Sequence, residues 1–321
     1  METWLIILLS IIAFIIIIFF VSTYIVYRMA FYNDSKFKYE DSCDHLLTGD
    51  DYDEYLDITK KGIEIALNTP HTDYDIKSHD GLNLHGRYYE FSKGAPIILE
   101  FHGYKGNCVR DLAGGLNRDK KEGYNIFMVD LRGHGMSDGR TISFGIKERL
   151  DVLTWVEFLN KEFNNPIIFL YGISMGAATV LLSSSLKFPS NVKGIIADCP
   201  YSSAYEITTL VALNMGIKKW FSSPMLKLAA LIYGHFSLTK ISPKSEIVKS
   251  TLPILIIHGT GDHFVPVEMS IEMASLNKDK VKLSLFEGAP HGYSCYKDID
   301  RYFKEINEFK DKILNNEKLN D

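Results

Sequence analysis

The pentapeptide Gly172-Ile173-Ser174-Met175-Gly176 lies between an apolar run at 167–171 and a segment of small residues at 177–186. The run is expected to form a buried strand and the segment a helix, and a G-x-S-x-G motif at such a junction is typical of a nucleophile elbow, which exposes a reactive serine on a sharp turn. Both glycines are expected because a Cβ there would crowd the neighbouring backbone. The helix start would also direct free N–H groups toward the serine. The motif therefore predicts Ser174 as a nucleophile.

Short apolar runs without polar alternation recur on both sides of this motif, and such runs are typical of strands buried on both faces of a parallel sheet. They lie at 97–101, 126–130, 167–171, 194–198, 254–258 and 281–286. Amphipathic segments of helical length separate them, at 109–122, 144–163, 177–188, 267–276 and 296–313. Two further strands, 74–78 and 82–90, are joined at Asp80-Gly81, which is a hairpin signal. The pattern predicts an α/β fold with a mostly parallel, doubly wound sheet and an antiparallel N-terminal hairpin.

One connection, at about 201–250, is too long for a simple loop. It is rich in methionine and aromatic residues, which predicts a helical cap over the strand ends. Trp220, Phe221 and Met225 are candidate substrate contacts, although each taken singly also fits a position in the core.

A serine hydroxyl needs a neighbouring base to become nucleophilic, and that base needs an orienting acid. His291 follows the last predicted strand and Asp262 follows the strand before it, in the order Ser-Asp-His that the elbow fold requires. Asp198 is the alternative acid, since it ends the strand after the elbow helix. We predict Asp262. The other histidines near strand ends are interpreted as structural: His102, His134, His258 and His263.

The chemistry also needs an oxyanion hole, in which two backbone N–H groups point to where the carbonyl oxygen becomes negative. Met175, directly after the serine, is the first predicted donor. The second is predicted to be Tyr104, in the glycine-containing loop at 102–107 that follows a buried strand.

The N-terminal part divides into a tail at 1–3, an apolar segment at 4–27 and an acidic, tyrosine-rich arm at 28–72. About 20 apolar residues suffice to cross a bilayer, so 4–27 predicts a transmembrane helix. A cleaved signal peptide is the alternative, but its basic start and small-residue cleavage site are missing. Lysine and arginine occur only after the segment, which favours a cytoplasmic domain on a single-pass protein of the cell membrane. We expect the arm to be a tether that packs on the edge of the domain, with a partner-binding arm as the alternative. The domain at 73–321 is expected to fold without the bilayer.

Charge and cysteine usage exclude some partners. The net charge of −5 is concentrated at 1–70, which holds eleven acidic and five basic residues, and no basic stripe follows it. Nucleic acid is therefore not an expected partner. The cysteines, Cys43, Cys108, Cys199 and Cys295, form no C-x-x-C motif, so no metal or cofactor is predicted.

Five motifs, taken in order across about 73–313, resemble those of the α/β-hydrolase superfamily. They are His102-Gly103, Asp130-Leu131-Arg132-Gly133-His134-Gly135-Met136-Ser137, the elbow pentapeptide, His258-Gly259-Thr260-Gly261-Asp262 and Pro290-His291-Gly292. Within this superfamily, the chain is similar to membrane-anchored bacterial hydrolases grouped with serine aminopeptidase-like and monoacylglycerol-lipase-like proteins. The resemblance implies an α/β-hydrolase fold and a structural role for the motif at 130–135. It does not cover the apolar segment, the arm or the cap.

The leading hypothesis is a serine hydrolase that cleaves small-molecule or lipid acyl esters through an acyl-enzyme. A thioesterase or an aminopeptidase would use the same residues. The aminopeptidase is less favoured because the cap holds only Glu206 and Glu246 to bind a free amino terminus. A non-catalytic binding protein of this fold is a further alternative, and a serine in place of aspartate at the elbow disfavours a dehalogenase. The sequence gives no indication of an oligomeric state.

Overall fold

The computed structural model describes residues 2–319. Its centre is an eight-stranded sheet in the order β1-β2-β4-β3-β5-β6-β7-β8. β1 pairs with β2, and β2 with β4, in antiparallel fashion, while the remaining pairs are parallel. The predicted mostly parallel sheet with an antiparallel N-terminal hairpin is confirmed. The strands are β1 (Thr72–Lys77), β2 (Asn83–Tyr89), β3 (Ile97–Phe101), β4 (Asn125–Val129), β5 (Ile168–Ile173), β6 (Val192–Asp198), β7 (Ile254–Gly259) and β8 (Val281–Phe286).

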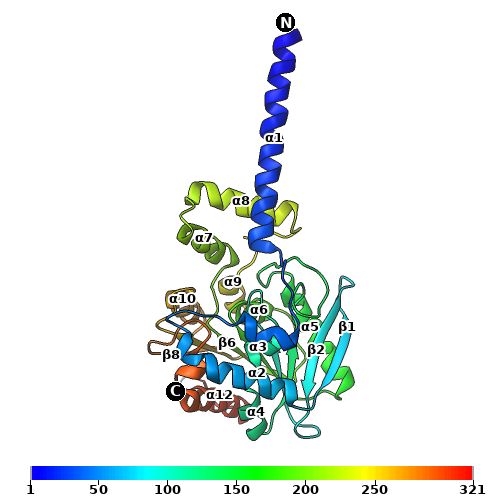
Figure 1. Cartoon of the computed structure of the whole chain (residues 1–321). Coiled ribbons are helices and arrows are strands. Elements are labelled where there is room, and N and C mark those ends of the chain that lie inside the picture. The colour runs from blue at the N-terminus through cyan, green and yellow to red at the C-terminus, as the bar shows by residue number, and fades with distance from the viewer. Residues whose placement is uncertain (1, 320–321) are drawn as a thin grey trace.

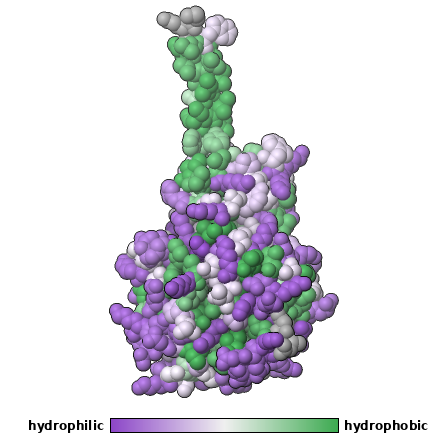
Figure 2. All heavy atoms as spheres, turned by 180° about the vertical axis from the view of Figure 1, so that it is seen from behind, coloured by the Kyte–Doolittle hydropathy of each residue, from purple (hydrophilic) through white to green (hydrophobic). Residues whose placement is uncertain are grey.

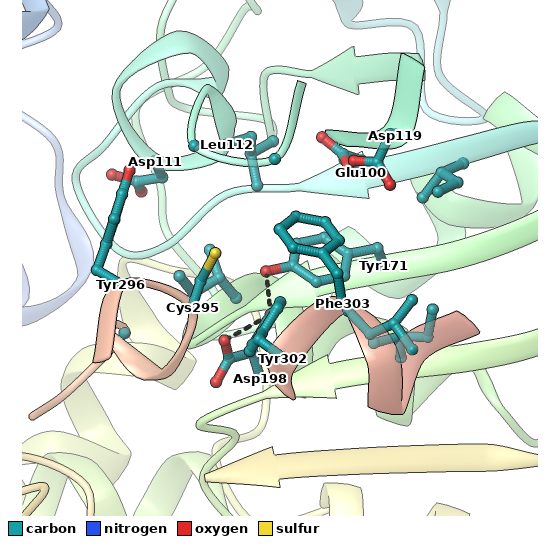
Figure 3. Close-up of a pocket in the computed structure, with 17 residues that line it drawn as sticks. Glu100, Asp111, Leu112, Asp119, Tyr171, Asp198, Cys295, Tyr296, Tyr302 and Phe303 are labelled. Carbon is teal, nitrogen blue, oxygen red and sulfur yellow. Dashed lines mark hydrogen bonds between the residues drawn. The ribbon is translucent and has the colours of Figure 1, made fainter. Parts of the chain in front are cut away.

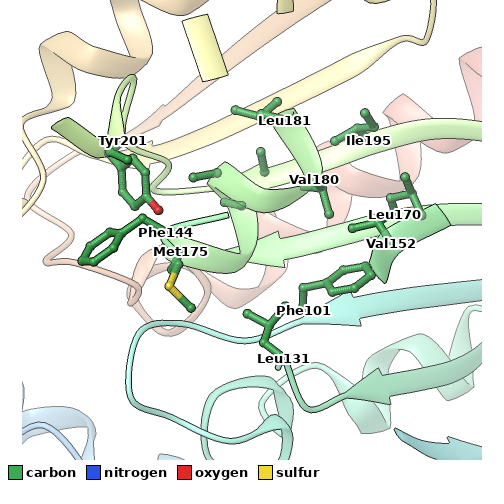
Figure 4. Close-up of a cluster of buried hydrophobic side chains, with 14 of the residues drawn as sticks. Phe101, Leu131, Phe144, Val152, Leu170, Met175, Val180, Leu181, Ile195 and Tyr201 are labelled. Atoms are coloured by element: carbon green, nitrogen blue, oxygen red, sulfur yellow. The ribbon is translucent and has the colours of Figure 1, made fainter. Parts of the chain in front are cut away.

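Helices cover both faces of this sheet (Figure 1). Alternate strand residues point to opposite faces. Leu99, Leu170 and Ile195 therefore pack with α5 and α6, whereas Ile98 and Phe169 pack with α2 and α3. Figure 4 shows part of the first cluster. The covering helices are α2 (Leu56–Asn68), α3 (Cys108–Leu112), α4 (Leu116–Lys121), α5 (Glu148–Glu162), α6 (Met175–Ser183), α9 (Pro243–Ile247), α10 (Val267–Leu276), α11 (Ser294–Lys297) and α12 (Ile299–Leu314).

Two segments predicted as single helices are interrupted. The segment at 109–122 forms α3 and α4, because the consecutive Gly114 and Gly115 between them disfavour a continuous helix. The segment at 296–313 forms most of α12, which begins after Asp298 caps its first turn by accepting a hydrogen bond from the Arg301 N–H at 3.1 Å.

The predicted cap is helical. It consists of α7 (Ala204–Asn214) and α8 (Lys219–Ile232), which lie above the sheet, with α8 beside the lower turns of the N-terminal helix (Figure 1). Ser203 caps α7 by accepting from the Glu206 N–H at 3.4 Å.

The N-terminal helix α1 (Glu2–Phe31) is longer than the predicted 4–27. It is long and apolar enough to cross a membrane, and Figure 2 shows its hydrophobic surface above a mostly hydrophilic domain. Residues 3–21 are exposed on every side, but Thr23, Tyr27 and Phe31 are buried. This spacing of four places one face of the last two turns against the domain.

The arm packs against the domain through side-chain contacts along its length. The Tyr39 hydroxyl, in the 3₁₀ helix η1 (Tyr39–His45), donates to Asp130 Oδ2 at 2.6 Å, and the Ser42 hydroxyl lies 3.3 Å from Asn107 Oδ1. A second 3₁₀ turn, η2 (Asp53–Tyr55), brings the Tyr55 ring to 5.3 Å from that of Tyr293. These contacts attach the arm to the domain, and removing the arm would expose core surface.

Candidate active site

Ser174 lies on a strained turn between β5 and α6. Its φ of 53° and ψ of −113° are rarely adopted by a residue with a side chain, as expected at a nucleophile elbow. The turn is tight: a Cβ on Gly172 would lie 2.4 Å from the Gly176 backbone, and one on Gly176 only 2.0 Å from the Phe101 carbonyl oxygen. The Ser174 N–H donates to the Asp198 carbonyl at 2.8 Å, which fixes the turn to β6.

The three residues predicted to form a triad are connected by hydrogen bonds. Ser174 Oγ lies 2.8 Å from His291 Nε2, and His291 Nδ1 lies 2.6 Å from Asp262 Oδ2. Asp262 follows β7 and His291 follows β8, so the parallel strands bring all three side chains to the carboxyl edge of the sheet. With Nδ1–H donating to the carboxylate, His291 Nε2 is free to accept the serine proton.

Asp262 is held as a carboxylate. Its Oδ1 accepts from the Phe264 and Val265 N–H groups at 2.9 and 2.7 Å. Burial alone would raise the pKa of Asp262, but the hydrogen bonds and charges of His258 and His291 outweigh burial and hold that pKa well below its usual range. A carboxylate that stays ionised can stabilise an imidazolium at His291.

His258 was interpreted as structural from the sequence, yet it contacts the predicted acid. Its Nε2 lies 3.1 Å from Asp262 Oδ2 and 3.0 Å from the Val265 carbonyl. Both partners are acceptors, so this nitrogen must carry a proton, and Nδ1 accepts from the Ser270 hydroxyl at 2.6 Å. The spacing of four between His258 and Asp262, across the end of β7, is the sequence signal for this contact.

The alternative acid, Asp198, faces away from the histidine. The Tyr302 hydroxyl donates to Asp198 Oδ2 at 2.8 Å and lies 3.0 Å from the Tyr171 hydroxyl (Figure 3). Asp198, Tyr302 and Tyr171 line a small cavity of about 50 Å³ on the α12 side of the sheet. Burial raises the pKa of Asp198 to about 6, although the hydrogen bond from Tyr302 opposes the shift. The structure thus pairs His291 with Asp262 and not with Asp198.

The two predicted oxyanion donors are free among the residues that the structure describes: neither the Tyr104 N–H nor the Met175 N–H has a protein acceptor. Hydrogen bonds on both sides of Tyr104 hold its loop. The Gly103 N–H donates to Asp111 Oδ2 at 2.8 Å, and the Lys105 N–H donates to His134 Nε2 at 3.1 Å. Burial lowers the pKa of His134, which keeps this nitrogen unprotonated as an acceptor.

Ser174 lies between two cavities. The apolar cavity, of about 390 Å³, is bounded by α1, the Tyr104 loop and the cap helices α7 and α8. The second cavity, of about 230 Å³, is bounded by the arm, the Tyr104 loop and His291. Of the three candidate substrate contacts, Phe221 and Met225 line the apolar cavity, whereas Trp220 does not and 76% of its surface is exposed. Adjacent helical residues point about 100° apart, so Phe221 and Trp220 cannot both face inward.

Potential metal ligands of Cys199, Asp262 and His291 lie within 4.8 Å of one another. Both ring nitrogens of His291 already make hydrogen bonds, and burial raises the pKa of the Cys199 thiol well above its usual range. A neutral thiol is a poor metal ligand. This arrangement therefore favours proton transfer over metal binding.

Comparisons with known proteins agree with this geometry. Residues 93–247 match the family model described as serine aminopeptidase, S33, and residues 217–312 match the dienelactone hydrolase family. The uncharacterized protein YqkD of Bacillus subtilis is 29% identical over 244 residues, which are 75% of this chain and 80% of YqkD.

Solved structures share the fold. The esterase Pf2001 of Pyrococcus furiosus superposes with a TM-score of 0.63 at 22% identity, covering 77% of this chain and 93% of the esterase. The acylaminoacyl peptidase of Pyrococcus horikoshii superposes with a TM-score of 0.59 at 20% identity, covering 78% of this chain and 43% of the peptidase. With the family matches, the sheet order and the elbow, these findings identify the chain as a serine hydrolase of the α/β-hydrolase superfamily.

Proposed function

We propose that this protein hydrolyses acyl esters, with Ser174 as nucleophile, His291 as general base and acid, and Asp262 as the orienting carboxylate. The observation that carries the proposal is the hydrogen-bonded chain from Ser174 through His291 to Asp262, which lies beside a large apolar cavity. The histidine and carboxylate supply proton transfer, and the cavity supplies the binding site for an apolar acyl group.

In the proposed reaction, Ser174 Oγ attacks the ester carbonyl carbon while its proton passes to His291 Nε2. The N–H groups of Tyr104 and Met175 stabilise the oxyanion, and Asp262 stabilises the imidazolium. The imidazolium then protonates the alcohol as the carbon–oxygen bond breaks, leaving an acyl group on Ser174. A water molecule, deprotonated by His291, attacks this acyl-enzyme and releases the carboxylic acid.

The two cavities suggest how the ester is oriented. His291 must protonate the departing alcohol, and it lines the second cavity but not the apolar one. We therefore assign the acyl chain to the apolar cavity and the alcohol to the second cavity, where Tyr52 and Arg110 offer polar atoms. The apolar cavity is more than twice the size of a cavity of about 150 Å³ that binds benzene, so it has room for a chain of eight or more carbons.

Peptides fit this site less well. No carboxylate lines the apolar cavity within the described residues. In the second cavity, Asp111 already accepts from the Arg110 guanidinium at 2.5 Å. A free amino terminus would find no unpaired acidic partner there. Thioesters would use the same machinery, and a thioesterase remains the second candidate because the acyl cavity does not distinguish oxygen from sulfur in the leaving group.

We also propose that α1 is a single-pass anchor in the cell membrane with the hydrolase domain on the cytoplasmic side. Its length and apolar surface support the anchor, and the basic residues after it support the orientation. The burial of Tyr27 and Phe31 against the domain favours a retained helix over a cleaved signal peptide.

The experiment is a series of p-nitrophenyl esters from two to sixteen carbons, with the matching acyl thioesters and aminoacyl p-nitroanilides, assayed with the full chain in detergent. We expect the highest kcat/KM with ester chains of at least eight carbons and negligible cleavage of the anilides. A preference for the anilides would contradict the ester proposal, and a preference for thioesters would select the second candidate.

A further inference from the structure

One wall of the apolar cavity comes from the N-terminal helix α1. Val26, Met29 and Ala30, from the last turns of α1, line it opposite Phe221 and Met225 of α8. The membrane-spanning candidate thus continues into the cavity that reaches Ser174, and a chain in this cavity would touch it.

The last turns of α1 are attached both to the loop before α5 and to the cap segment at 201–250. Tyr27 Oη lies 2.7 Å from Thr141 Oγ1, and the Tyr233 hydroxyl, just after α8, donates to the Phe20 carbonyl at 3.0 Å. The Phe31 ring lies 5.4 Å from that of Phe236. Helix and cap therefore form one packed unit.

α1 is also linked to the loop that carries a proposed oxyanion donor. The Tyr104 hydroxyl donates to the Ala30 carbonyl at 3.1 Å, and the Tyr104 ring stacks on that of Phe144 at 5.3 Å. The helix end therefore helps to position the Tyr104 loop as well as lining the cavity.

The length of the free part of α1 sets the height of the cavity relative to a bilayer. Residues 3–21 have exposed side chains throughout, and only near their end does the Phe20 carbonyl accept a hydrogen bond from Tyr233. These 19 residues at 1.5 Å each extend about 28 Å, close to the hydrocarbon thickness of about 30 Å. The docked turns that follow would then lie at the level of the lipid headgroups. Tyr24, with 43% of its surface exposed, lies at this level, where tyrosines of membrane proteins are enriched.

The cavity reaches the surface at the same level. Met29, Met215 and Phe221 line it, yet 53%, 57% and 45% of their surfaces are exposed. Beside them, the start of α8 exposes Trp220 together with Lys218 and Lys219. An exposed apolar edge with flanking cations is typical of a surface that rests on a bilayer.

We propose, on the basis of the ester hydrolase function above, that the substrate is a membrane lipid ester whose acyl chain passes laterally from the bilayer into the apolar cavity between α1 and α8. In this arrangement α1 is a part of the substrate site. Val26, Met29 and Ala30 contact the acyl chain, and the ester reaches Ser174 without its chain crossing water. The alcohol portion occupies the second cavity on the arm side.

The first test compares Val26→Trp with Ile25→Trp, using the full chain in phosphatidylcholine vesicles. Val26 lines the cavity, whereas the neighbouring Ile25 is exposed and does not. For each protein the ratio of kcat/KM for p-nitrophenyl dodecanoate to that for the acetate is measured. We expect Val26→Trp to lower this ratio at least tenfold, because the indole fills the chain site, and Ile25→Trp to leave it unchanged. Equal ratios in all three proteins would overturn the proposal.

The second test uses the wild-type protein, so it does not require that a variant folds. A fluorophosphonate with a twelve-carbon chain and a terminal diazirine is attached to the wild-type enzyme and photolysed. Cross-links to the peptide that contains 26–30 are expected, and cross-links confined to the arm at 46–59 would contradict the wall assignment. Failure of the proposed function would appear differently, as wild-type protein that cleaves neither ester and takes up no probe.

Discussion

At the scale of single residues, two buried aspartates at the ends of neighbouring strands have pKa values that are shifted in opposite directions. Asp262 receives two backbone N–H groups and two histidines, so its pKa lies well below the usual range. Asp198 has the Tyr302 hydroxyl as its side-chain partner, and burial raises its pKa to about 6. Only Asp262 combines a stable negative charge with a hydrogen bond to His291, which is the combination that a triad acid needs.

Asp262→Asn is expected to lower kcat for a p-nitrophenyl ester by about 10⁴, because the amide carries no charge and favours the wrong histidine tautomer. The measurement is steady-state hydrolysis by the purified, folded variant. Asp198→Asn is the matched control and should retain most of the activity. A larger loss in the Asp198 variant would reverse the assignment of the acid.

We also expect the titration of Asp198 to make the free energy of unfolding depend on pH. Its folded pKa of about 6 exceeds the unfolded value of about 3.9, so the folded state binds more protons between pH 4 and 6. The contribution of this group to stability is therefore complete at low pH and is lost as the pH rises through about 6.

Asp198→Asn removes this titration, so the Tm of the variant relative to wild type should increase from pH 4 to pH 7. Thermal unfolding in detergent at several pH values measures this difference. A constant difference across the range would show that Asp198 does not titrate as described.

At the scale of elements, the sequence predicted the strands, the elbow and the strand ends that carry the proposed triad, because short-range patterns determine them. Gly172 is required by a contact within the elbow itself. Strand order brings Asp262 and His291 to the same edge, so the proposed triad could be assembled from sequence. The side of α8 that faces the cavity could not be predicted from the sequence. Trp220 and Phe221 are adjacent, and only the position of the packed helix determines which of them faces inward. The specific contacts of the arm could not be predicted for a similar reason, since the partner of Tyr39 is Asp130, 91 residues away.

The docking of α1 predicts a stability effect outside any membrane. Phe31 is completely buried between Phe144 and Phe236. Phe31→Ala should lower the free energy of unfolding by about 3–5 kcal/mol, the usual cost of this truncation in a core. Ile16→Ala, in the exposed part of the same helix, should change it little. Urea unfolding of both variants in detergent measures the difference, and equal effects would indicate that α1 is not packed on the domain.

At the scale of the whole molecule, a bare apolar helix emerges from a charged domain beside the mouth of an apolar cavity (Figures 1 and 2). A spanning helix is retained by burial of apolar surface and not by charge. The full chain should therefore stay in the membrane pellet after a carbonate wash. Release by that wash, or a mature N-terminus at 22–35, would contradict the anchor. Resistance of the domain to external protease in intact cells should accompany the cytoplasmic orientation.

The central claim is that Ser174 is the nucleophile, and covalent labelling tests it most directly. A fluorophosphonate reacts only with a serine activated by its neighbours, so intact-mass measurement should find one adduct on the wild-type chain, located at Ser174 by peptide mapping. Ser174→Ala should acquire no adduct, while Ser203→Ala, which alters only the cap of α7, should be labelled like wild type. Equal labelling of wild type and Ser174→Ala would contradict the account.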